Sequence, residues 1–372
     1  MNFTQYLNIS SVSNATAGPG TLVARLSALL PVLLLSLLLV LLSGCNQGSV
    51  LDQRLDNYLE RLARSLEQQP LMRIDKIDVK LPRPRALQIS VAATSLNLLE
   101  FVELSQCELH RVIAARNSSL GKLAVPSQDL LHQLDFLKHV DSCLALITAD
   151  NPELAEKLRS AAADKQKALP AYLWRATLGG AEFRDFWNHA QNDTSYPLNA
   201  DSRTDFALTR LNQIISNILA GQYEVDATQF HEILAVLRNG EGGALLHSWS
   251  RTHVAMTAAG QVMADRLGRK PLCYPAMKTS QANIFRNVIT DYFVKQVQPL
   301  IADLNRRYYD IMPRIRQLET DLAAAEPSAY RDYRQQRDLQ LKQAHDSVAQ
   351  HIRQAAPLLE QCGFLPTASG PQ

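Results

Sequence analysis

Apolar residues recur every three or four positions through the last third of this 372-residue chain. In a first segment they are Ile289, Phe293, Val297, Leu300, Leu304, Tyr308, Ile311, Ile315, Leu318 and Leu322. In a second they are Leu341, His345, Val348, Ile352, Ala355 and Leu359. This spacing matches the period of an α-helix, about 3.6 residues per turn. With a turn at Glu326-Pro327-Ser328 between the segments, it predicts a long antiparallel C-terminal helix hairpin, kinked at Pro299 and Pro313.

Helical spacing also governs most of the chain before this hairpin. Five leucines share one face of a predicted helix over 51–68: Leu51, Leu55, Leu59, Leu62 and Leu66. The polar face of this helix mixes acidic and basic side chains, which favours packing in a bundle over lying in lipid. Further helices are expected over 96–116, 127–147, 152–169, 171–176, 181–190, 226–238 and 243–266, and between Ser202 and Gly221.

The stretch after the first helix is different, because Pro70, Pro82 and Pro84 exclude a long helix there. Residues 74–79 and 88–91 alternate weakly between apolar and polar types, which is typical of short strands. The predicted fold class is therefore mainly α: a helical bundle with the long hairpin and at most a minor short-strand element near residues 74–91.

The N-terminal region has the pattern of an export signal. Arg25 precedes an uncharged run of 17 residues over 26–42, and Leu42-Ser43-Gly44-Cys45 follows at once. The small residues give a protease access to the backbone, and the cysteine thiol is the nucleophile that can acquire a lipid. The pattern resembles the lipobox of bacterial lipoproteins, so we expect lipidation at Cys45. The alternative is an uncleaved signal anchor, but this run is short for a membrane span and an anchor does not need this ending.

This interpretation sets the predicted organisation and location. The segments are a signal peptide over 1–44, a lipidated cysteine and short linker over 45–50, an N-terminal helical lobe over 51–200, a C-terminal helical lobe over 201–365 and a tail over 366–372. The boundary near 200 falls in the polar, loop-like stretch 191–205. In bacterial lipoproteins, Asp directly after the lipidated cysteine commonly signals retention in the inner membrane. This chain has Asn46 there, so we expect the outer membrane, facing the periplasm.

Four cysteines follow Cys45, and an even number in an oxidising compartment predicts two disulfides. Three pairings are possible, and no CxxC spacing indicates a metal site. Closing each helical hairpin favours Cys107 with Cys143 and Cys273 with Cys362.

The balance of charge argues against a nucleic-acid partner. Lys and Arg total 38 against 36 Asp and Glu, for a formal net charge of +2. A mixture of arginines and tyrosines over 305–338 resembles a nucleic-acid surface, but seven arginines there face six acidic residues. We therefore predict a solvated, salt-bridged helix face.

Several short motifs resemble catalytic or metal-binding patterns. Ser119 to Lys122 matches SxxK, and Lys278-Thr279-Ser280 resembles its KTG partner in penicillin-recognising enzymes. That fold needs a central sheet, so an interhelical loop with capping serines is favoured instead. His132, Asp135 and His139 share a helical face, but the two histidines are too far apart for one ion. We therefore assign no catalytic, cofactor-binding or metal-binding residue.

One group of segments resembles a known family. The segments are Cys107-Glu108-Leu109, Arg116-Asn117-Ser118-Ser119-Leu120-Gly121-Lys122, Leu134-Asp135-Phe136-Leu137, Leu173-Trp174-Arg175-Ala176-Thr177-Leu178-Gly179-Gly180 and Cys362-Gly363. The likeness covers most of the chain after Cys45. The family consists of uncharacterised lipoproteins of Gram-negative bacteria and is defined only as a domain of unknown function. The resemblance implies a lipoprotein location and brings no activity.

Together these features predict a periplasmic lipoprotein held to the membrane through Cys45, with envelope proteins or the cell wall as partners. A non-enzymatic binding or scaffold protein is the first hypothesis. An envelope hydrolase or transferase is the alternative, and a pocket holding a nucleophile beside a base would favour it.

Overall fold

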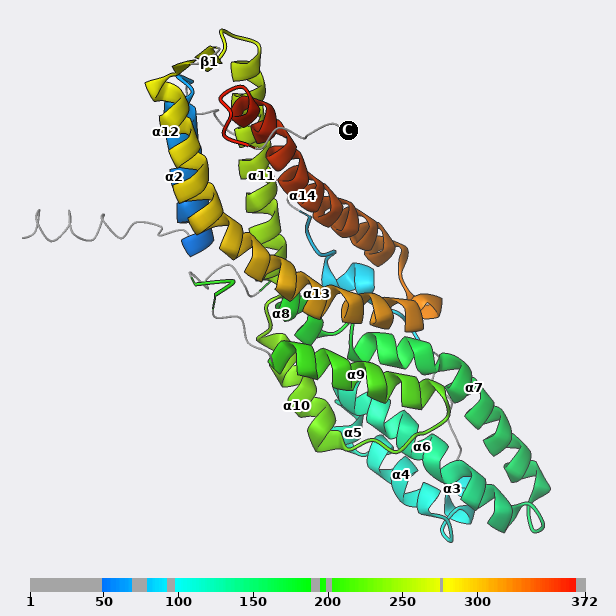
Figure 1. Cartoon of the computed structure of the whole chain (residues 1–372). Coiled ribbons are helices and arrows are strands. Elements are labelled where there is room, and N and C mark those ends of the chain that lie inside the picture. Colours follow the sequence, from blue (N-terminus) through cyan, green and yellow to red (C-terminus); the bar gives the residue numbers. More distant parts are fainter. Residues whose placement is uncertain are drawn as a thin grey trace, which may run out of the picture. The chain divides into compact units, whose positions relative to one another are not determined.

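The computed structural model describes residues 49–68, 79–91, 98–188, 195–198, 203–274 and 277–365, which are mainly α-helical (Figure 1). The predicted fold class is thus confirmed. The predicted signal peptide and Cys45 lie outside the described residues. Residues from Gly48 to Gln372 group into one compact unit.

The first half of the chain forms short and long helices, and two of the long helices pack closely along each other. They are α2 (Val50–Ser65), the 3₁₀ turn η1 (Pro84–Leu87), α3 (Leu98–Glu103), α4 (Glu108–Asn117), α5 (Ser119–Lys122), α6 (Pro126–Ile147), α7 (Pro152–Ala176) and α8 (Ala181–Asn188). Helices α6 and α7 pack along each other, and α4 packs on α6. The predicted single helix over 96–116 is divided, because Cys107 is extended where it bonds to Cys143.

Helix α7 differs from the prediction because it runs through Pro170 without ending. A proline inside a helix removes one backbone hydrogen bond and crowds the preceding turn. Here Leu169, Leu173 and Trp174 are buried on both sides of it. Their packing therefore maintains one continuous helix where two were predicted.

The strand prediction near residues 74–91 is wrong for its second part. Residues 88–91 are irregular, and residues 74–78 lie outside the described part. Leu87 is buried, and its carbonyl accepts a 3.0 Å hydrogen bond from Nε1 of Trp174, so side-chain packing replaces sheet pairing there. The sheet within the described residues has two antiparallel strands, β1 (Cys273–Tyr274) and β2 (Met277–Lys278).

The second half contains the longest helices. They are α9 (Arg203–Leu219), α10 (Ala227–Arg238), α11 (Gly242–Leu267), α12 (Ser280–Val288), the π-helix η3 (Ile289–Val297), α13 (Gln298–Asp321), the 3₁₀ turn η4 (Ala323–Ala325) and α14 (Ser328–Glu360). The predicted outgoing helix of the hairpin is thus α12, η3 and α13 in succession. Its predicted apolar face is correct: all ten positions are buried except Tyr308, which is half-buried.

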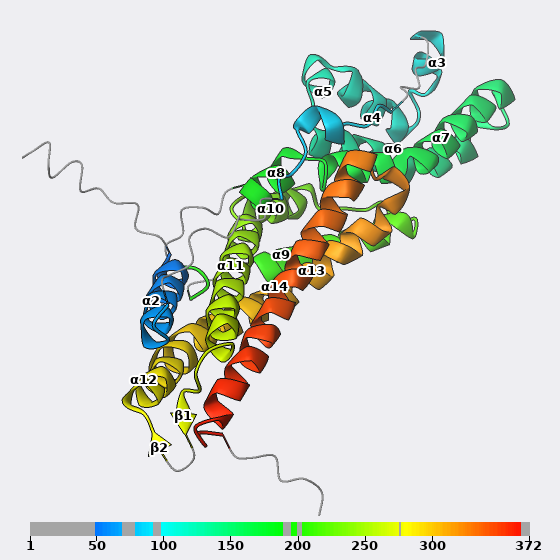
Figure 2. The ribbon, with the colours of Figure 1, turned by 90° about the horizontal axis from the view of Figure 1, so that it is seen from above.

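Helices α13 and α14 run in opposite directions as predicted, but α14 packs most closely along α11 (Figures 1 and 2). Small residues allow this approach, because Ala255, Ala259 and Gly260 of α11 are buried. A Cβ atom on Gly260 would lie 2.1 Å from the side-chain oxygen of Gln354 on α14. The hairpin prediction thus holds for the direction of α14 but did not identify α11 as its close neighbour.

Packing against α11 also changes the buried face of α14. From Leu341 onward, the buried residues of α14 are Leu341, Ala344, Ser347, His351, Ala355 and Leu358, whereas the predicted Ile352 is 52% exposed. The buried face of α14 is thus rotated by about one residue from the predicted face. Small side chains of α14 contact α11, and larger ones lie at the edge of this contact.

Helix α2 shows that packing does not follow chain order. It belongs to the predicted N-terminal lobe, yet it packs against α11, α12 and η3 of the predicted C-terminal lobe. Leu51, Leu55, Leu62 and Leu66 are fully buried in this packing, as the leucine spacing predicts. The first described helix is therefore an integral part of the core.

Candidate functional site

The candidate site starts from the ordered beginning of α2. Ser49 caps the helix by accepting a hydrogen bond from the Asp52 backbone, while the Asp52 carboxylate accepts one from the Ser49 backbone. Such a capping box fixes the first turn. Asp52 also pairs with Nε of Arg251 on α11 at 2.6 Å, and Asp56 pairs with the same guanidinium at 3.0 Å. The first turn of α2 is therefore fastened to α11.

Those contacts set the charge of Asp52. Burial raises the pKa of its carboxyl, but the hydrogen bond and positive charge of Arg251 outweigh burial and lower the pKa overall. Asp52 is therefore ionised at neutral pH, and its ion pair with Arg251 persists there.

A buried polar pair lies further along α2. The hydroxyl of Tyr58 and Nε2 of His351 on α14 are hydrogen-bonded at 2.7 Å. The Phe293 ring packs against both, with centroids 5.4 Å from Tyr58 and 4.4 Å from His351. Tyr58 and His351 are 0% and 1% exposed, and Nδ1 of His351 has no hydrogen-bond partner among the described residues. These side chains join α2, η3 and α14 in the interior.

Burial determines the protonation of this pair. It lowers the pKa of His351 to about 4 and raises the pKa of the Tyr58 hydroxyl. Both groups are therefore neutral at physiological pH. Because neither is reached by solvent, the pair can position helices but cannot act as base and acid on an external substrate.

The π-helix η3 brings Phe293 to this pair. The backbone N–H of Gln298 donates to the carbonyl of Phe293, five residues earlier. Pro299 follows directly and has no N–H to donate. On the same segment, the guanidinium of Arg61 lies 4.2 Å from the Tyr292 ring centroid, and Arg54 donates to Gln296 at 2.6 Å. Turns of π-helix are rare in proteins, and those that occur are frequently at functional sites. This one forms part of the surface on which α2 packs.

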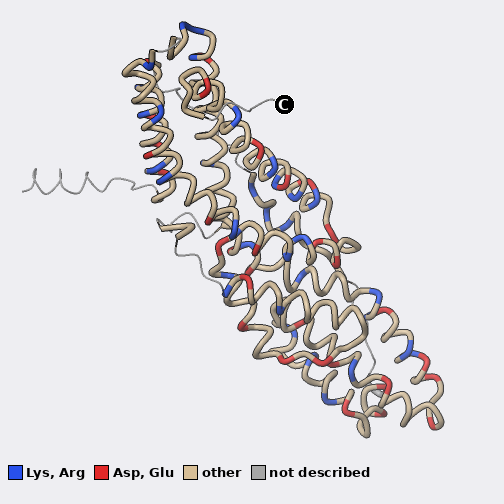
Figure 3. The backbone as a smooth tube through the Cα atoms, in the orientation of Figure 1, with Lys and Arg blue, Asp and Glu red and all other residues tan. Residues whose placement is uncertain are grey.

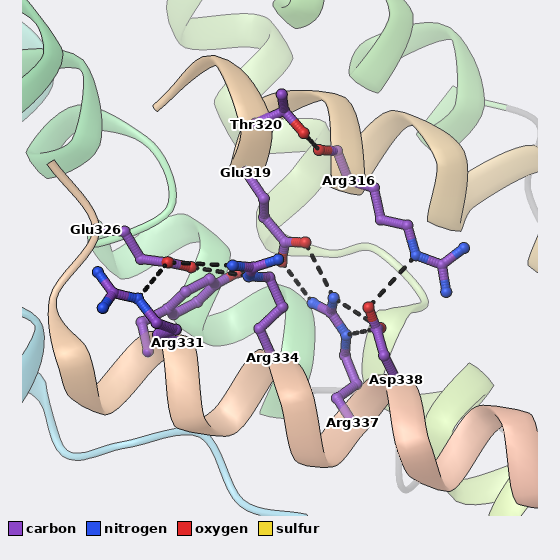
Figure 4. Close-up of polar contacts among 9 residues, drawn as sticks. Arg316, Glu319, Thr320, Glu326, Arg331, Arg334, Arg337 and Asp338 are labelled. Carbon is purple, nitrogen blue, oxygen red and sulfur yellow. Dashed lines mark hydrogen bonds and ion pairs between the residues drawn. The ribbon is translucent and has the colours of Figure 1, made fainter. Parts of the chain in front are cut away.

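A second polar cluster lies where α13 and α14 meet (Figure 4). Arg337 donates to both oxygens of Glu319, at 2.6 and 3.0 Å, and the Tyr330 hydroxyl donates to Glu319 at 2.9 Å. The side chains of Arg337 and Glu319 are 0% and 1% exposed. Burial opposes the charged form of Arg337, but its bonds to Glu319 outweigh this effect and raise its pKa. The result is a buried, two-hydrogen-bond ion pair between the two helices.

This pair corrects one sequence-based prediction. The arginines of 305–338 are salt-bridged as expected, but the face is only partly solvated, because Arg307 and Arg337 are buried. The guanidinium of Arg337 also lies 5.5 Å from the Trp187 ring centroid. Elsewhere acidic and basic residues are interspersed along the helices (Figure 3).

The two SxxK-related segments lie far apart in both views, on α5 and on β2 with α12 (Figures 1 and 2). Ser118 caps α5 by accepting from the Gly121 backbone at 3.0 Å, as expected for an interhelical loop. A Cβ on Gly121 would lie 2.3 Å from the Ala115 carbonyl oxygen, so this turn needs glycine. Thr279 likewise caps α12 through the Ala282 backbone. Both segments have structural roles and do not form one site.

The remaining candidates are placed as follows. His132, Asp135 and His139 lie on α6, and no group of three or more metal-ligating side chains is assembled within the described residues. No helix in the described ranges is long and apolar enough to cross a membrane. Cys107 bonds to Cys143 and Cys273 bonds to Cys362, which is the predicted pairing.

Sequence reasoning missed Tyr58, His351 and the burial of Glu319 with Arg337. For Tyr58 a signal was present, because it stands three residues after Leu55 and four before Leu62, at helical spacing on the buried face. The partner of each group lies on another helix, and one sequence carries no signal for that pairing.

Comparison with known proteins identifies a family. The model of a family described as "Protein of unknown function (DUF3080)" matches residues 55–366. No curated protein and no solved structure matches the chain. The matched span includes both disulfides and both buried clusters.

Proposed function

The chain belongs to the DUF3080 family of proteins of unknown function, and we propose that it is a lipid-anchored periplasmic protein that binds or scaffolds other envelope components. In this proposal the lipid on Cys45 holds it to the outer membrane, facing the periplasm. Its partners are envelope proteins or the cell wall.

The observation that carries this proposal is the short distance in sequence between Cys45 and the first rigid helix. Helix α2 begins at Val50, five residues after Cys45. Five extended residues span at most about 17 Å. Because α2 is capped and packed into the core, a lipid at Cys45 would hold a rigid body directly at the membrane surface.

The disulfides support an exported location. Cys107–Cys143 and Cys273–Cys362 account for all four cysteines after Cys45. Such bonds persist in oxidising compartments such as the bacterial periplasm and are rare in the cytosol. A signal-like N-terminus and this cysteine usage are independent features that favour the same compartment.

A binding role is supported by what is buried and what is exposed. Tyr58 and His351 have the chemistry of an acid–base pair, but both are buried and serve packing. Leu120 and Leu123 on and after α5 are 84% and 81% exposed. Large apolar side chains exposed together are typical of contact surfaces for other molecules.

The test is metabolic labelling with radioactive palmitate, followed by fractionation of the envelope. We expect label in the wild-type protein and none in Cys45→Ala, which should remain a larger, unprocessed precursor. As a matched control, Cys107→Ala should still carry label, because that thiol forms a disulfide within the body. Labelling and processing of Cys45→Ala at the wild-type level would overturn the proposal.

A further inference from the structure

Exposed apolar and basic side chains lie together around the Cys273–Cys362 disulfide. This hairpin-end surface consists of Tyr274, Met277, Lys278, Arg286 and Phe364. Tyr274 and Met277, paired across β1 and β2, are 47% and 57% exposed. The disulfide fixes the strands to the end of α14, so these residues have a defined arrangement.

Two cations on this surface share one aromatic ring. Nζ of Lys278 lies 4.7 Å from the centroid of the Phe364 ring, and the guanidinium carbon of Arg286 lies 4.9 Å from it. Neither cation has a carboxylate partner among the described residues. The ring thus holds two like charges near each other, and a negative group placed between them would gain from both.

A separate groove lies between α2 and α12. Arg61, Arg64 and Glu67 on and after α2 face Gln281, Ile284 and Val288 of α12 across a groove of about 330 Å³. Ile284 is 52% exposed, Arg61 contacts the Tyr292 ring, and Arg64 pairs with Glu60 at 2.9 Å, so the charges of this groove are mixed. On the hairpin-end surface, unlike in this groove, exposed apolar side chains lie beside cations without carboxylate partners in the described ranges, which is typical of surfaces that rest on a membrane.

We propose that the hairpin-end surface docks on the anionic phospholipid headgroups of a bilayer. This inference rests on the proposed function, because the lipid on Cys45 is what brings α2 to the membrane. Helix α2 is 16 residues long, or about 24 Å at 1.5 Å per residue, and its last turn lines the groove with α12. At the bilayer surface, Lys278 and Arg286 meet phosphates while Tyr274 and Met277 enter the interface.

The experiment measures vesicle binding by the chain from Asn46 onward, which lacks the lipidated cysteine. All described helices lie within Gly48–Gln372, so this chain retains the compact unit. Co-sedimentation is measured with phosphatidylcholine vesicles and with vesicles containing one-third phosphatidylglycerol. We expect binding to the anionic vesicles that weakens as salt is raised, and much weaker binding to the neutral ones.

Variants test the named residues. Each Lys or Arg near an anionic leaflet strengthens partitioning about fivefold, so Lys278→Gln with Arg286→Gln should weaken binding about 25-fold. Met277→Asp should weaken it as well. The matched control is Lys122→Gln, because Lys122 is also exposed and lies between the exposed Leu120 and Leu123. Circular dichroism checks that every variant retains its helices.

The proposal is overturned if the wild-type chain binds both vesicle types equally or if the double variant binds like wild type. It is also overturned if Lys122→Gln loses as much affinity for anionic vesicles as the double variant. Binding to an acidic polypeptide without binding to vesicles would overturn it too. The chain tested has no Cys45, so a failure to bind vesicles is distinct from a failure of lipidation in cells.

Discussion

Tyr58 and His351 lie 293 positions apart in the chain, yet their side chains share a buried hydrogen bond of 2.7 Å. The bond links α2, the helix nearest the proposed lipid anchor, to α14. Phe293 of the π-helix packs on both rings. This buried cluster therefore contributes to the attachment of α2, together with its buried leucines and the Asp52–Arg251 ion pair.

Replacing Tyr58 with Phe should destabilise the protein while leaving its shape in place. The ring still fills its site, but Nε2 of His351 is left buried without a partner, which costs about 1–3 kcal/mol. Urea unfolding followed by circular dichroism measures this loss. The control is Tyr309→Phe, because Tyr309 is 60% exposed and should change the unfolding free energy by less than about 0.5 kcal/mol. Equal effects of the two changes would argue against a structural role for the Tyr58 hydroxyl.

His351 should also make the stability depend on pH. Its pKa falls from 6.5 to about 4 in the folded protein. Between these values the unfolded chain binds a proton that the folded chain does not, so stability falls as pH falls. The full contribution, present above pH 6.5, is about 3 kcal/mol, and it is lost progressively as the pH drops to about 4.

The measurement compares the wild-type protein with His351→Gln at pH 7 and pH 4. Carboxylates such as Asp52, whose pKa is lowered, also reduce stability in acid, but they do so in both proteins. The difference between the two pH dependences therefore isolates His351. A variant as acid-sensitive as wild type would mean that the imidazole is not the responsible group.

Much of this fold follows from local pattern. The apolar spacing over 289–322 correctly predicted the buried face of η3 and α13. The face of α14 was displaced by one residue, because Ala344 and Ser347 pack on the small residues of α11 while Ile352 is exposed. Hydrophobicity alone favours the larger side chains for the core. Which face is buried depends on the shape of a partner helix that lies about a hundred residues away in sequence.

The burial of the Arg337–Glu319 ion pair could not be predicted from the local sequence pattern, for a related reason. Arg337 follows other arginines and precedes Asp338, so its sequence context is that of an exposed, charged helix face. Its burial arises because Glu319 and Tyr330 turn toward it from the end of α13 and the first turn of α14. Charge pattern predicts that arginines will be paired, whereas tertiary packing decides whether a pair meets water.

Glu319→Gln should therefore destabilise the protein strongly. Arg337 would remain buried without its full counter-charge, and breaking such a pair typically costs about 3–5 kcal/mol. Replacing both residues, as Glu319→Leu with Arg337→Met, should recover a large part of this loss, because no unpaired charge remains. Urea unfolding of the single and double variants measures the difference.

An exposed pair provides the control for that series. Asp291 and Lys295 are 2.8 Å apart, with side chains 49% and 65% exposed. Asp291→Asn should leave the unfolding free energy nearly unchanged, because solvent screens such pairs. If Glu319→Gln is as mild as this control, the buried pair does not hold α13 to α14.

The Cys273–Cys362 disulfide gives a further prediction. It closes a loop with a sequence separation of 89 residues, and its loss in Cys273→Ser should cost about 5 kcal/mol in the chain-entropy model. Cys362 is 5% exposed, so its free thiol should react with maleimide only slowly until urea is added. Peptide mapping should find Cys107 still bonded to Cys143. A bond between Cys362 and either of those residues would contradict the independence of the two disulfides.

The proposed sorting to the outer membrane can be tested at Asn46. The amide of Asn46 follows the proposed lipidated cysteine directly, and Asp at this place commonly retains bacterial lipoproteins in the inner membrane. Asn46→Asp should therefore move the protein from outer-membrane to inner-membrane fractions on a sucrose gradient. Helix α2 and its capping box begin at Ser49, so the change should leave the fold and the palmitate label intact. Asn46→Gln, which remains uncharged, is the matched control and should stay in the outer membrane. If wild type and Asn46→Asp both carry the palmitate label and both fractionate with the inner membrane, the predicted outer-membrane location is wrong.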